Sequence, residues 1–272
     1  VDLPPGWQAD PGDDHPAVAY RRRILRSETM SDKDEPALRK VMAGYLALCE
    51  HLDREIGKVL AALADLGLSD DTRIIYTSDH GEMAGAHGLF GKSCLFEDSI
   101  RVPLLMAGPG IPEGRVVDAP VSHVDLYPTL LDCVGADADP PADDLMGVSL
   151  WQEFDAASAQ RPAFAEYHAA GSASGGFMLR DGRWKLLYHV GMPRQLFDLE
   201  ADPGELVDLG PDHPKAEELE AKLRRICDPE AVDARAKADQ REWIAHWGGA
   251  DAVASEALLI YTPPPGEPAE ME

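Results

Sequence analysis

The chain has 272 residues and carries 25 Lys and Arg against 49 Asp and Glu, a formal net charge of −24. This acidic excess excludes a nucleic-acid-binding protein with a basic face, although a few local cations can still hold a small anion. No apolar run approaches the roughly 18 residues of a membrane-spanning helix, so neither nucleic acid nor membrane is an expected partner.

Four cysteines stand far apart, and none forms a C-x-x-C pair: Cys49, Cys94, Cys133 and Cys227. This spacing argues against a disulfide framework or a structural zinc site and predicts buried, reduced thiols. Reduced thiols favour the cytoplasm over the periplasm, although the sequence does not decide whether the protein is exported. The chain begins at Val1 without a basic, apolar leader, so we expect either a processed protein or part of a longer one.

Residues 35–66 have the pattern of a long amphipathic helix, with apolar side chains at three- and four-residue steps. Pro36 suits its first turn, and Gly67 suits the left-handed position after its last. The next run, Arg73–Thr77, is short, β-branched and nearly all apolar, which predicts a parallel strand buried on both faces. A long helix followed directly by such a strand is typical of an α/β fold.

A second strand is predicted over Val102–Met106. Ser122 and Asp125 form a capping-box pattern at the start of a helix, which Gly135 ends. An acidic connection over residues 137–161 then separates this region from the rest of the chain.

Beyond the connection the pattern changes to short strands divided by Gly- and Pro-containing turns, expected over residues 163–168, 176–180, 183–189 and 195–199. Asp181-Gly182 is a hairpin signal between two of them. Helices are predicted over 211–227 and 230–247, with a disordered tail after Tyr261. We therefore predict an α/β protein in two parts. Residues 1–150 hold part of a parallel sheet flanked by helices, and residues 151–272 hold a smaller antiparallel-sheet α+β subdomain.

Candidate metal ligands follow the first predicted strand. Asp79 and His80 lie within the segment Ser78–Glu82, at the end of a parallel strand where open α/β sheets place their ligands. A carboxylate beside an imidazole suits Mn, Zn, Fe or Ca. The alternative is an ordinary loop with a salt-bridged histidine.

Two further residues of the same loop are candidates for contact with a substrate. Lys92 follows Asp79 by thirteen residues, and its ammonium group suits a sulfate or phosphate oxygen. His87 offers a proton donor or a second anion contact. A solvated lysine and a plain loop histidine are the alternatives. Glu97 and Arg101 are spaced to form an i, i+4 ion pair that supports the loop.

The segments around these residues resemble the sulfatase family of the alkaline phosphatase superfamily. The similar segments run in family order over about residues 35–225: Ser78–Met83, Gly88–Lys92, Glu97–Pro103, Ser122–Leu131 and Leu196–Leu209. In having His directly after Asp79, the sequence is similar to choline sulfatases and phosphonate monoester hydrolases, whereas many arylsulfatases have Asn at this position.

The resemblance implies an alkaline-phosphatase-like sheet and a divalent metal, with Ca²⁺ or Mn²⁺ favoured ahead of Zn²⁺ or Fe²⁺. Asp79 and His80 would be two of its ligands, Lys92 would bind the sulfate or phosphate oxygens, and His87 would lie near the leaving group. The implied reaction is hydrolysis of a small-molecule sulfate ester by a formylglycine nucleophile, which the family makes from Cys or Ser in a C/S-x-P-x-R motif. A phosphate or phosphonate ester hydrolase on the same scaffold is the alternative.

The sequence departs from the family at the nucleophile. No Cys or Ser stands in a C/S-x-P-x-R context, and the paired N-terminal aspartates that complete the metal site are not found. We therefore interpret the chain as the C-terminal half of a sulfatase and predict that it has no turnover alone. The second class of hypothesis is a non-catalytic role, in which the truncated chain acts as a folded module or forms a homo-oligomer.

Overall fold

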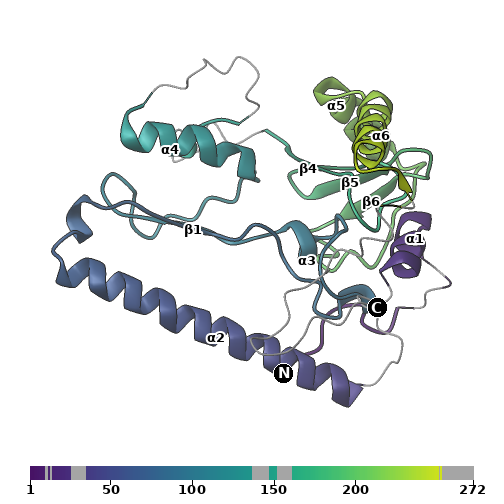
Figure 1. Ribbon diagram of the computed structural model, residues 1–272. Coiled ribbons are helices and arrows are strands. Elements are labelled where there is room, and N and C mark those ends of the chain that lie inside the picture. The colour runs from purple at the N-terminus through teal and green to yellow at the C-terminus, as the bar shows by residue number, and fades with distance from the viewer. Residues whose placement is uncertain are drawn as a thin grey trace.

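The computed structural model describes residues 1–9, 12, 14–25, 35–136, 147–151, 161–250 and 252. They form a two-stranded sheet with a long helix beside it, and a four-stranded sheet that carries most of the buried core (Figure 1). The tail expected after Tyr261 and most of the 137–161 connection lie outside the described residues.

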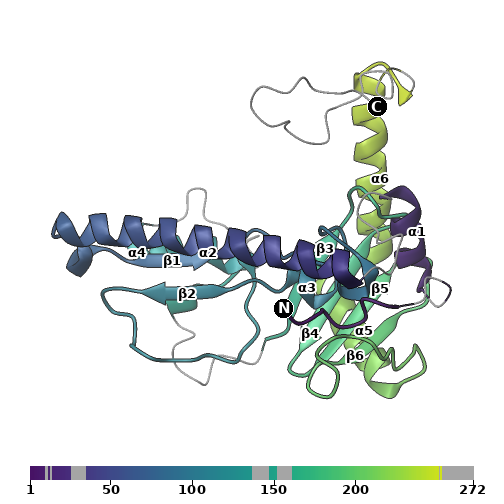
Figure 2. The ribbon, with the colours of Figure 1, turned by 90° about the horizontal axis from the view of Figure 1, so that it is seen from below.

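The long helix α2 (Glu35–Asp65) confirms the periodicity of the sequence, and Gly67 after it has the expected left-handed backbone, with φ +70°. The helix runs beside the two-stranded sheet (Figures 1 and 2). Leu38 is the buried residue of this helix. Its other apolar side chains, such as Leu48 at 68% exposure, lie largely in solvent.

The two-stranded sheet corrects one expectation. Strands β1 (Ile74–Thr77) and β2 (Leu104–Ala107) pair antiparallel, with Thr77 opposite Leu104, and the residues of β1 are only half-buried. A parallel pair needs a crossover connection, usually a helix laid along the sheet. Residues 78–103 instead contain only short helical turns, η4 (Ala86–Gly88) and α3 (Glu97–Ile100). The chain therefore enters β2 beside the end of β1, and β2 runs back along β1 in the opposite direction.

Helix α4 (Leu126–Val134) begins and ends as predicted. The turn η5 (His123–Asp125) before it carries the full capping box, with the Ser122 amide donating to Asp125 Oδ2 at 2.8 Å. Gly135 closes the helix at φ +64°. Asp125 is fully buried. Its carboxylate is compensated there, because it also accepts from the Val148 amide at 3.0 Å and pairs with Arg161.

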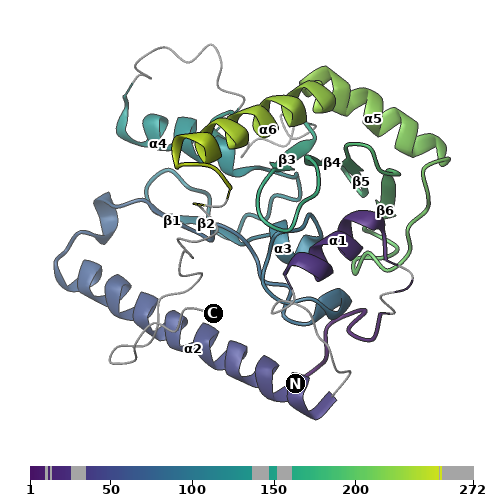
Figure 3. The same ribbon diagram turned by 45° about the vertical axis from the view of Figure 1, so that its right-hand side comes forward.

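The second sheet is a four-stranded antiparallel meander, as the hairpin and strand signals predicted. Its strands are β3 (Ala163–Tyr167), β4 (Gly176–Asp181), β5 (Trp184–His189) and β6 (Gln195–Asp198). Helices α5 (Pro214–Ile226) and α6 (Pro229–His246) follow it, close to their predicted bounds. Both lie on one side of this sheet, and α1 (Pro16–Ile24) lies on the other (Figure 3).

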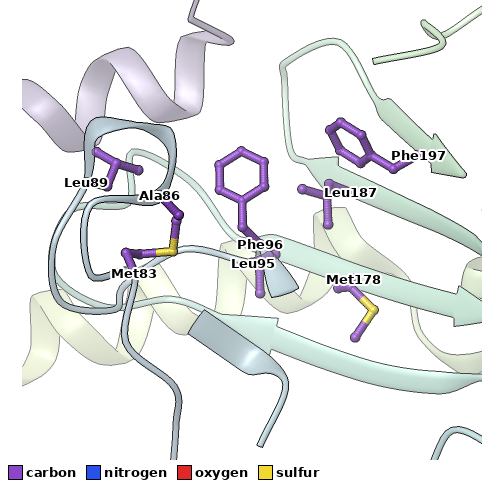
Figure 4. Packing of buried hydrophobic residues seen from close by; sticks show 8 residues of the cluster. All are labelled: Met83, Ala86, Leu89, Leu95, Phe96, Met178, Leu187 and Phe197. Atoms are coloured by element: carbon purple, nitrogen blue, oxygen red, sulfur yellow. The ribbon is translucent and has the colours of Figure 1, made fainter. Parts of the chain in front are cut away.

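Side chains of the second sheet alternate between two cores because a strand has a period of two. One core joins the sheet to α5: Phe177, Leu179, Leu186, Leu196, Ala216, Leu219 and Leu223. The other joins the opposite face to the segment 83–96, which comes from the first half of the chain: Met83, Ala86, Leu89, Leu95, Phe96, Met178, Leu187 and Phe197 (Figure 4). The division at residue 150 stays a prediction, and this second core crosses it.

All four cysteines are free thiols, as expected, but they are less buried than predicted, and Cys49 is exposed on α2. Over the part of the chain that the structure describes, no helix is both long and apolar enough to cross a membrane.

Candidate active site

Asp79 and His80 stand directly after β1, where the sequence predicted them. Local hydrogen bonds shape this turn: the His80 amide donates to Asp79 Oδ1 at 2.9 Å, and the Ser78 hydroxyl donates to the His80 carbonyl at 2.9 Å. The backbone hydrogen bond from His80 holds the pKa of the Asp79 carboxyl below its usual value. Asp79 is therefore an anion at neutral pH.

The tautomer of His80 follows from its neighbours. Its Nδ1 lies 2.8 Å from the Gly81 carbonyl oxygen, which only accepts, so Nδ1 carries the proton of the neutral ring. The other ring nitrogen, Nε2, lies 3.4 Å from Asp79 Oδ2. Two acceptors at this distance suit a cation between them, and a histidine that donates its other N–H to a backbone carbonyl is the usual metal-ligating arrangement.

Both side chains are open to solvent, with Asp79 82% and His80 40% exposed. Within the described ranges, no three His, Cys, Asp or Glu residues come together as a metal site. The donor types of Asp79 and His80 fit a divalent cation, and these are the two candidate donors at this turn among the described residues.

Gly81 is required by packing. A Cβ atom at this position would meet the Asp98 carbonyl oxygen at 2.1 Å, because the Gly81 amide hydrogen-bonds to the Ser99 carbonyl at 2.7 Å. The turn after the candidate ligands is therefore pressed against α3.

The loop between the ligands and Lys92 closes on itself through Glu82. One carboxylate oxygen, Glu82 Oε1, accepts from the amides of Ala84 at 3.0 Å and Gly91 at 2.5 Å. The Met83 amide donates to the Gly91 carbonyl at 2.8 Å. These bonds bring Gly91, and so Lys92 next to it, back beside the residues that follow Asp79 and His80.

Lys92 is exposed, as a residue that meets a substrate from solvent must be. Its backbone carbonyl is held at 3.1 Å by Arg21 Nε. Its ammonium group makes no ion pair or hydrogen bond with the described residues. The loop therefore presents an unpaired cation on a fixed backbone.

His87 lies in a different environment. It is 9% exposed and stacks on Phe96, with ring centroids 4.1 Å apart and planes within 9°. Burial lowers its pKa, so the ring is neutral, and its buried Nε2 has no partner among the described atoms. The ring therefore lies against Phe96, a residue of the core drawn in Figure 4, whereas the side chains of Asp79 and His80 are open to solvent.

Glu97 does not pair with Arg101, contrary to the spacing. Its carboxylate reaches strands β4 and β5 instead, where it accepts from Lys185 at 2.9 Å and from Arg180 at 3.1 Å. Lys185 is fully buried and also pairs with Glu205 at 2.7 Å. Desolvation raises the pKa of Glu205, and Lys185 opposes that shift. No local sequence pattern pointed to these partners, because each lies more than eighty residues from Glu97.

A small cavity lies between α1 and the four-stranded sheet, near the base of the loop. Its volume is about 30 Å³, and Ser93, His189 and Gln195 are among its lining residues. This space is enough for a water molecule and too small for an ester substrate. The candidate site is instead the exposed turn that carries Asp79 and His80, with the loop that carries Lys92.

Two family models match the chain. Residues 11–136 match the model described as Sulfatase, and residues 85–230 match the model described as N-sulphoglucosamine sulphohydrolase, C-terminal. The second match alone covers more than half of the 272 residues. Together they span both sheets and the loop that carries Lys92.

Curated relatives align over most of the chain. Arylsulfatase K of Mus musculus is 38% identical over 226 residues, which are 78% of this chain and 40% of the relative. The choline-sulfatase of Rhizobium meliloti (strain 1021) is 34% identical over 252 residues, which are 90% of this chain and 49% of the relative. The chain therefore spans less than half the length of these relatives.

Among solved structures, the phosphonate monoester hydrolase from Silicibacter pomeroyi superposes with a TM-score of 0.69 at 28% identity, covering 83% of this chain and 49% of that one. The arrangement of the two sheets is thus shared with a hydrolase that is named for a different ester.

Proposed function

Because this chain belongs to the sulfatase family of the alkaline phosphatase superfamily, we propose that it supplies part of the active site of a sulfate-ester hydrolase. Such an enzyme cleaves an ester with water to give an alcohol and sulfate. The observation that carries the proposal is one closed loop that begins at the exposed Asp79–His80 turn and ends at an exposed Lys92 whose ammonium group has no partner among the described residues.

In this proposal, Asp79 and the Nε2 atom of His80 hold a divalent cation, for which Ca²⁺ and Mn²⁺ are our first candidates ahead of Zn²⁺ and Fe²⁺. When bound, that cation draws charge from the nonbridging sulfate oxygens. The Gly81 carbonyl keeps the proton on Nδ1, so that Nε2 stays available. The backbone hydrogen bond from His80 lowers the pKa of the Asp79 carboxyl, so Asp79 stays ionised.

Lys92 binds a nonbridging oxygen of the ester through its ammonium group. A point-charge donor held on a fixed backbone stabilises the charge that builds up on these oxygens during cleavage. For His87, the buried ring stacked on Phe96 supports a role in holding the loop. A contact of His87 with the leaving group stays a prediction that its environment does not favour.

The nucleophile does not come from the printed sequence, because no Cys or Ser stands in a C/S-x-P-x-R context. The relatives are more than twice as long as their matched segments, so a complete enzyme has room for that motif outside the aligned residues. A small-molecule sulfate ester is the proposed substrate, and self-association of the chain stays open to test.

The experiment that tests the role of Lys92 uses the longest natural chain that contains these residues. Replacing Lys92 with Ala should lower kcat/KM for 4-nitrophenyl sulfate about 10²- to 10³-fold, as loss of one oxyanion donor does. Lys215→Ala is the matched control, since Lys215 makes only an exposed i, i+3 pair with Glu218. A Lys92→Ala enzyme within about threefold of the parent would contradict the proposal.

A phosphonate or phosphate ester is the second candidate substrate, and the superposition on the phosphonate monoester hydrolase favours keeping it. Rates on 4-nitrophenyl sulfate, 4-nitrophenyl phosphate and a phenylphosphonate ester of the same phenol separate the two. A higher kcat/KM for the phosphonate than for the sulfate would assign the enzyme to the second class.

The 272-residue chain by itself should show no turnover of 4-nitrophenyl sulfate, because it lacks the nucleophile motif and its described residues offer no cluster of three ligand donors. Product release measured over hours with added Ca²⁺ or Mn²⁺ checks this. Hydrolysis by the purified chain that Lys92→Ala abolishes would refute it.

A further inference from the structure

The loop that carries Lys92 has an unusual backbone. Six of its residues have positive φ: Ala84 (47°), Gly85 (98°), His87 (53°), Gly88 (66°), Gly91 (69°) and Ser93 (71°). Three of them have side chains, and a Cβ atom makes the left-handed region unfavourable. Such a backbone persists only where its surroundings hold it in place.

Two buried arginines of α1 supply part of that support. Arg21 donates to the Phe90 carbonyl at 2.7 Å and, from two of its nitrogens, to the Lys92 carbonyl. Arg22 donates to the Gly88 carbonyl at 3.0 Å and to the His87 carbonyl. We call these two guanidinium groups and the four carbonyls they bind the arginine clamp.

Burial and charge show that this clamp is a built feature of the fold. Arg21 is 2% exposed and Arg22 is 9% exposed, although arginine is rarely buried without partners. Asp14 pairs with Arg22 at 2.5 Å and balances its charge. The planar fork of arginine can bind two carbonyls at once, which a lysine ammonium does less well.

The neighbouring residue provides an internal comparison. Arg23 is exposed, and its guanidinium lies over the Tyr20 ring at 5.0 Å. Arg23 shares the helix, the charge and the side-chain type with Arg21, but its guanidinium contacts Tyr20 of the same helix.

The clamp holds the backbone of Lys92 while leaving its ammonium group exposed. The carbonyl of Lys92 is bound by Arg21, whereas its Nζ has no partner among the residues described. A displacement of about 1 Å at a group that contacts the reacting atoms can lower activity about a hundredfold.

We propose that Arg21 and Arg22 are positioning residues for Lys92: they hold the strained 84–93 loop so that the ammonium group meets the anionic ester. This inference rests on the proposed role of Lys92. It assigns a part in the site to a segment that lies before α2 and whose sequence shows only a short basic helix.

The test is a double-mutant cycle in the longest natural chain that contains these residues. Arg21→Gln should lower kcat/KM for 4-nitrophenyl sulfate about 10- to 100-fold when Lys92 is present and by no more than about twofold in a Lys92→Ala background. Arg23→Gln should leave kcat/KM unchanged in both backgrounds. Arg21→Lys keeps the charge without the fork, and it takes the place of Arg21→Gln if that variant does not fold.

A loss of the same factor in both backgrounds would overturn the proposal, because it would mean that Arg21 acts on the fold as a whole and not through Lys92. Loss of activity in the Arg23→Gln control would overturn it as well.

A second readout separates the clamp from the proposed function. Amide hydrogen exchange of Gly88, Leu89 and Gly91 in the 272-residue chain should become at least about tenfold faster in Arg21→Gln and Arg22→Gln, with the amides of β4 and β5 unchanged. Unchanged loop protection would overturn the clamp even in an active enzyme. If the unsubstituted full-length enzyme turns over no ester, the proposed function fails while the exchange result still decides whether the clamp orders the loop.

Discussion

The α2–β1–β2 layer and the four-stranded sheet differ in how completely they bury apolar side chains. Leu196 on β6 is 0% exposed, and both faces of its sheet pack on other elements. Leu48 on α2 is 68% exposed, and β1 has no fully buried residue. Burial of apolar area drives folding, so the four-stranded sheet contributes most of the stability of the described chain.

The candidate site lies where these two regions meet. Asp79 and His80 belong to the end of β1 in the open layer, whereas the loop that follows them packs on the closed sheet through Phe96 and Glu97. The exposed candidate ligands, Asp79 and His80, thus take their chain direction from β1, whereas the loop after them is held by its packing on the four-stranded sheet. Two pairs of substitutions and one change of pH test this difference between the two regions.

The largest effect is expected at the buried charge that joins the site to the sheet. Lys185→Ala leaves the buried carboxylate of Glu205 without its cation and leaves Glu97 with Arg180 alone, which should cost about 3–5 kcal/mol of unfolding free energy. Urea unfolding followed by circular dichroism measures it. Lys58→Ala, which removes an exposed i, i+3 pair on α2, should change stability by less than about 0.5 kcal/mol. Equal effects would contradict the contrast between the two regions.

Truncation of a leucine in each region tests the same contrast without charge. Leu196→Ala should destabilise by about 2–5 kcal/mol, because it removes a fully buried side chain and leaves a cavity. Leu48→Ala, the same change at an exposed position, should remain within about 0.5 kcal/mol. A large loss at Leu48 in the isolated chain would show that α2 is covered in solution, for instance by a second copy of the chain, and the concentration dependence of unfolding would then reveal it.

Acid should weaken the closed sheet through His189. Burial lowers the pKa of this ring from 6.5 to about 4. Between these values the unfolded chain binds a proton that the folded chain does not, so the unfolding free energy falls as the pH drops from 6.5 towards 4, by up to about 3 kcal/mol. Above pH 6.5 the His189 ring is neutral in both the folded and the unfolded chain, so its contribution to the unfolding free energy no longer changes with pH. His189→Gln should flatten the slope in this window, and His51→Gln on the exposed α2 helix is the control; an unaltered slope in His189→Gln would refute the assignment.

Features set by neighbouring residues were predictable from sequence. The bounds of α2, the capping box of Ser122 and Asp125, the left-handed Gly135 and the Asp181-Gly182 hairpin all appear where the pattern placed them. Each depends on hydrogen bonds or steric limits within a few residues, so the sequence order already contains both partners.

Strand direction and distant partners were not predictable in this way. The run Arg73–Thr77 has the composition of a buried parallel strand, but composition does not say whether the chain crosses over or returns, and β2 returns antiparallel. Glu97 has a suitable partner in Arg101 one helical turn away, yet it pairs with Lys185, which the hairpin brings to it across the core. A local pattern favours the near partner, whereas burial selects the far one.

Residue type and spacing were enough to predict most helices and strands, the order of the sulfatase motifs and Asp79, His80 and Lys92 as candidate site residues. The tertiary structure alone decided that Arg21 and Arg22 bind the carbonyls of the Lys92 loop, that Gly81 is pressed against Asp98, and that His87 is buried on Phe96. These contacts join segments far apart in the chain, and no spacing rule encodes a hydrogen bond that forms only when two such segments pack together.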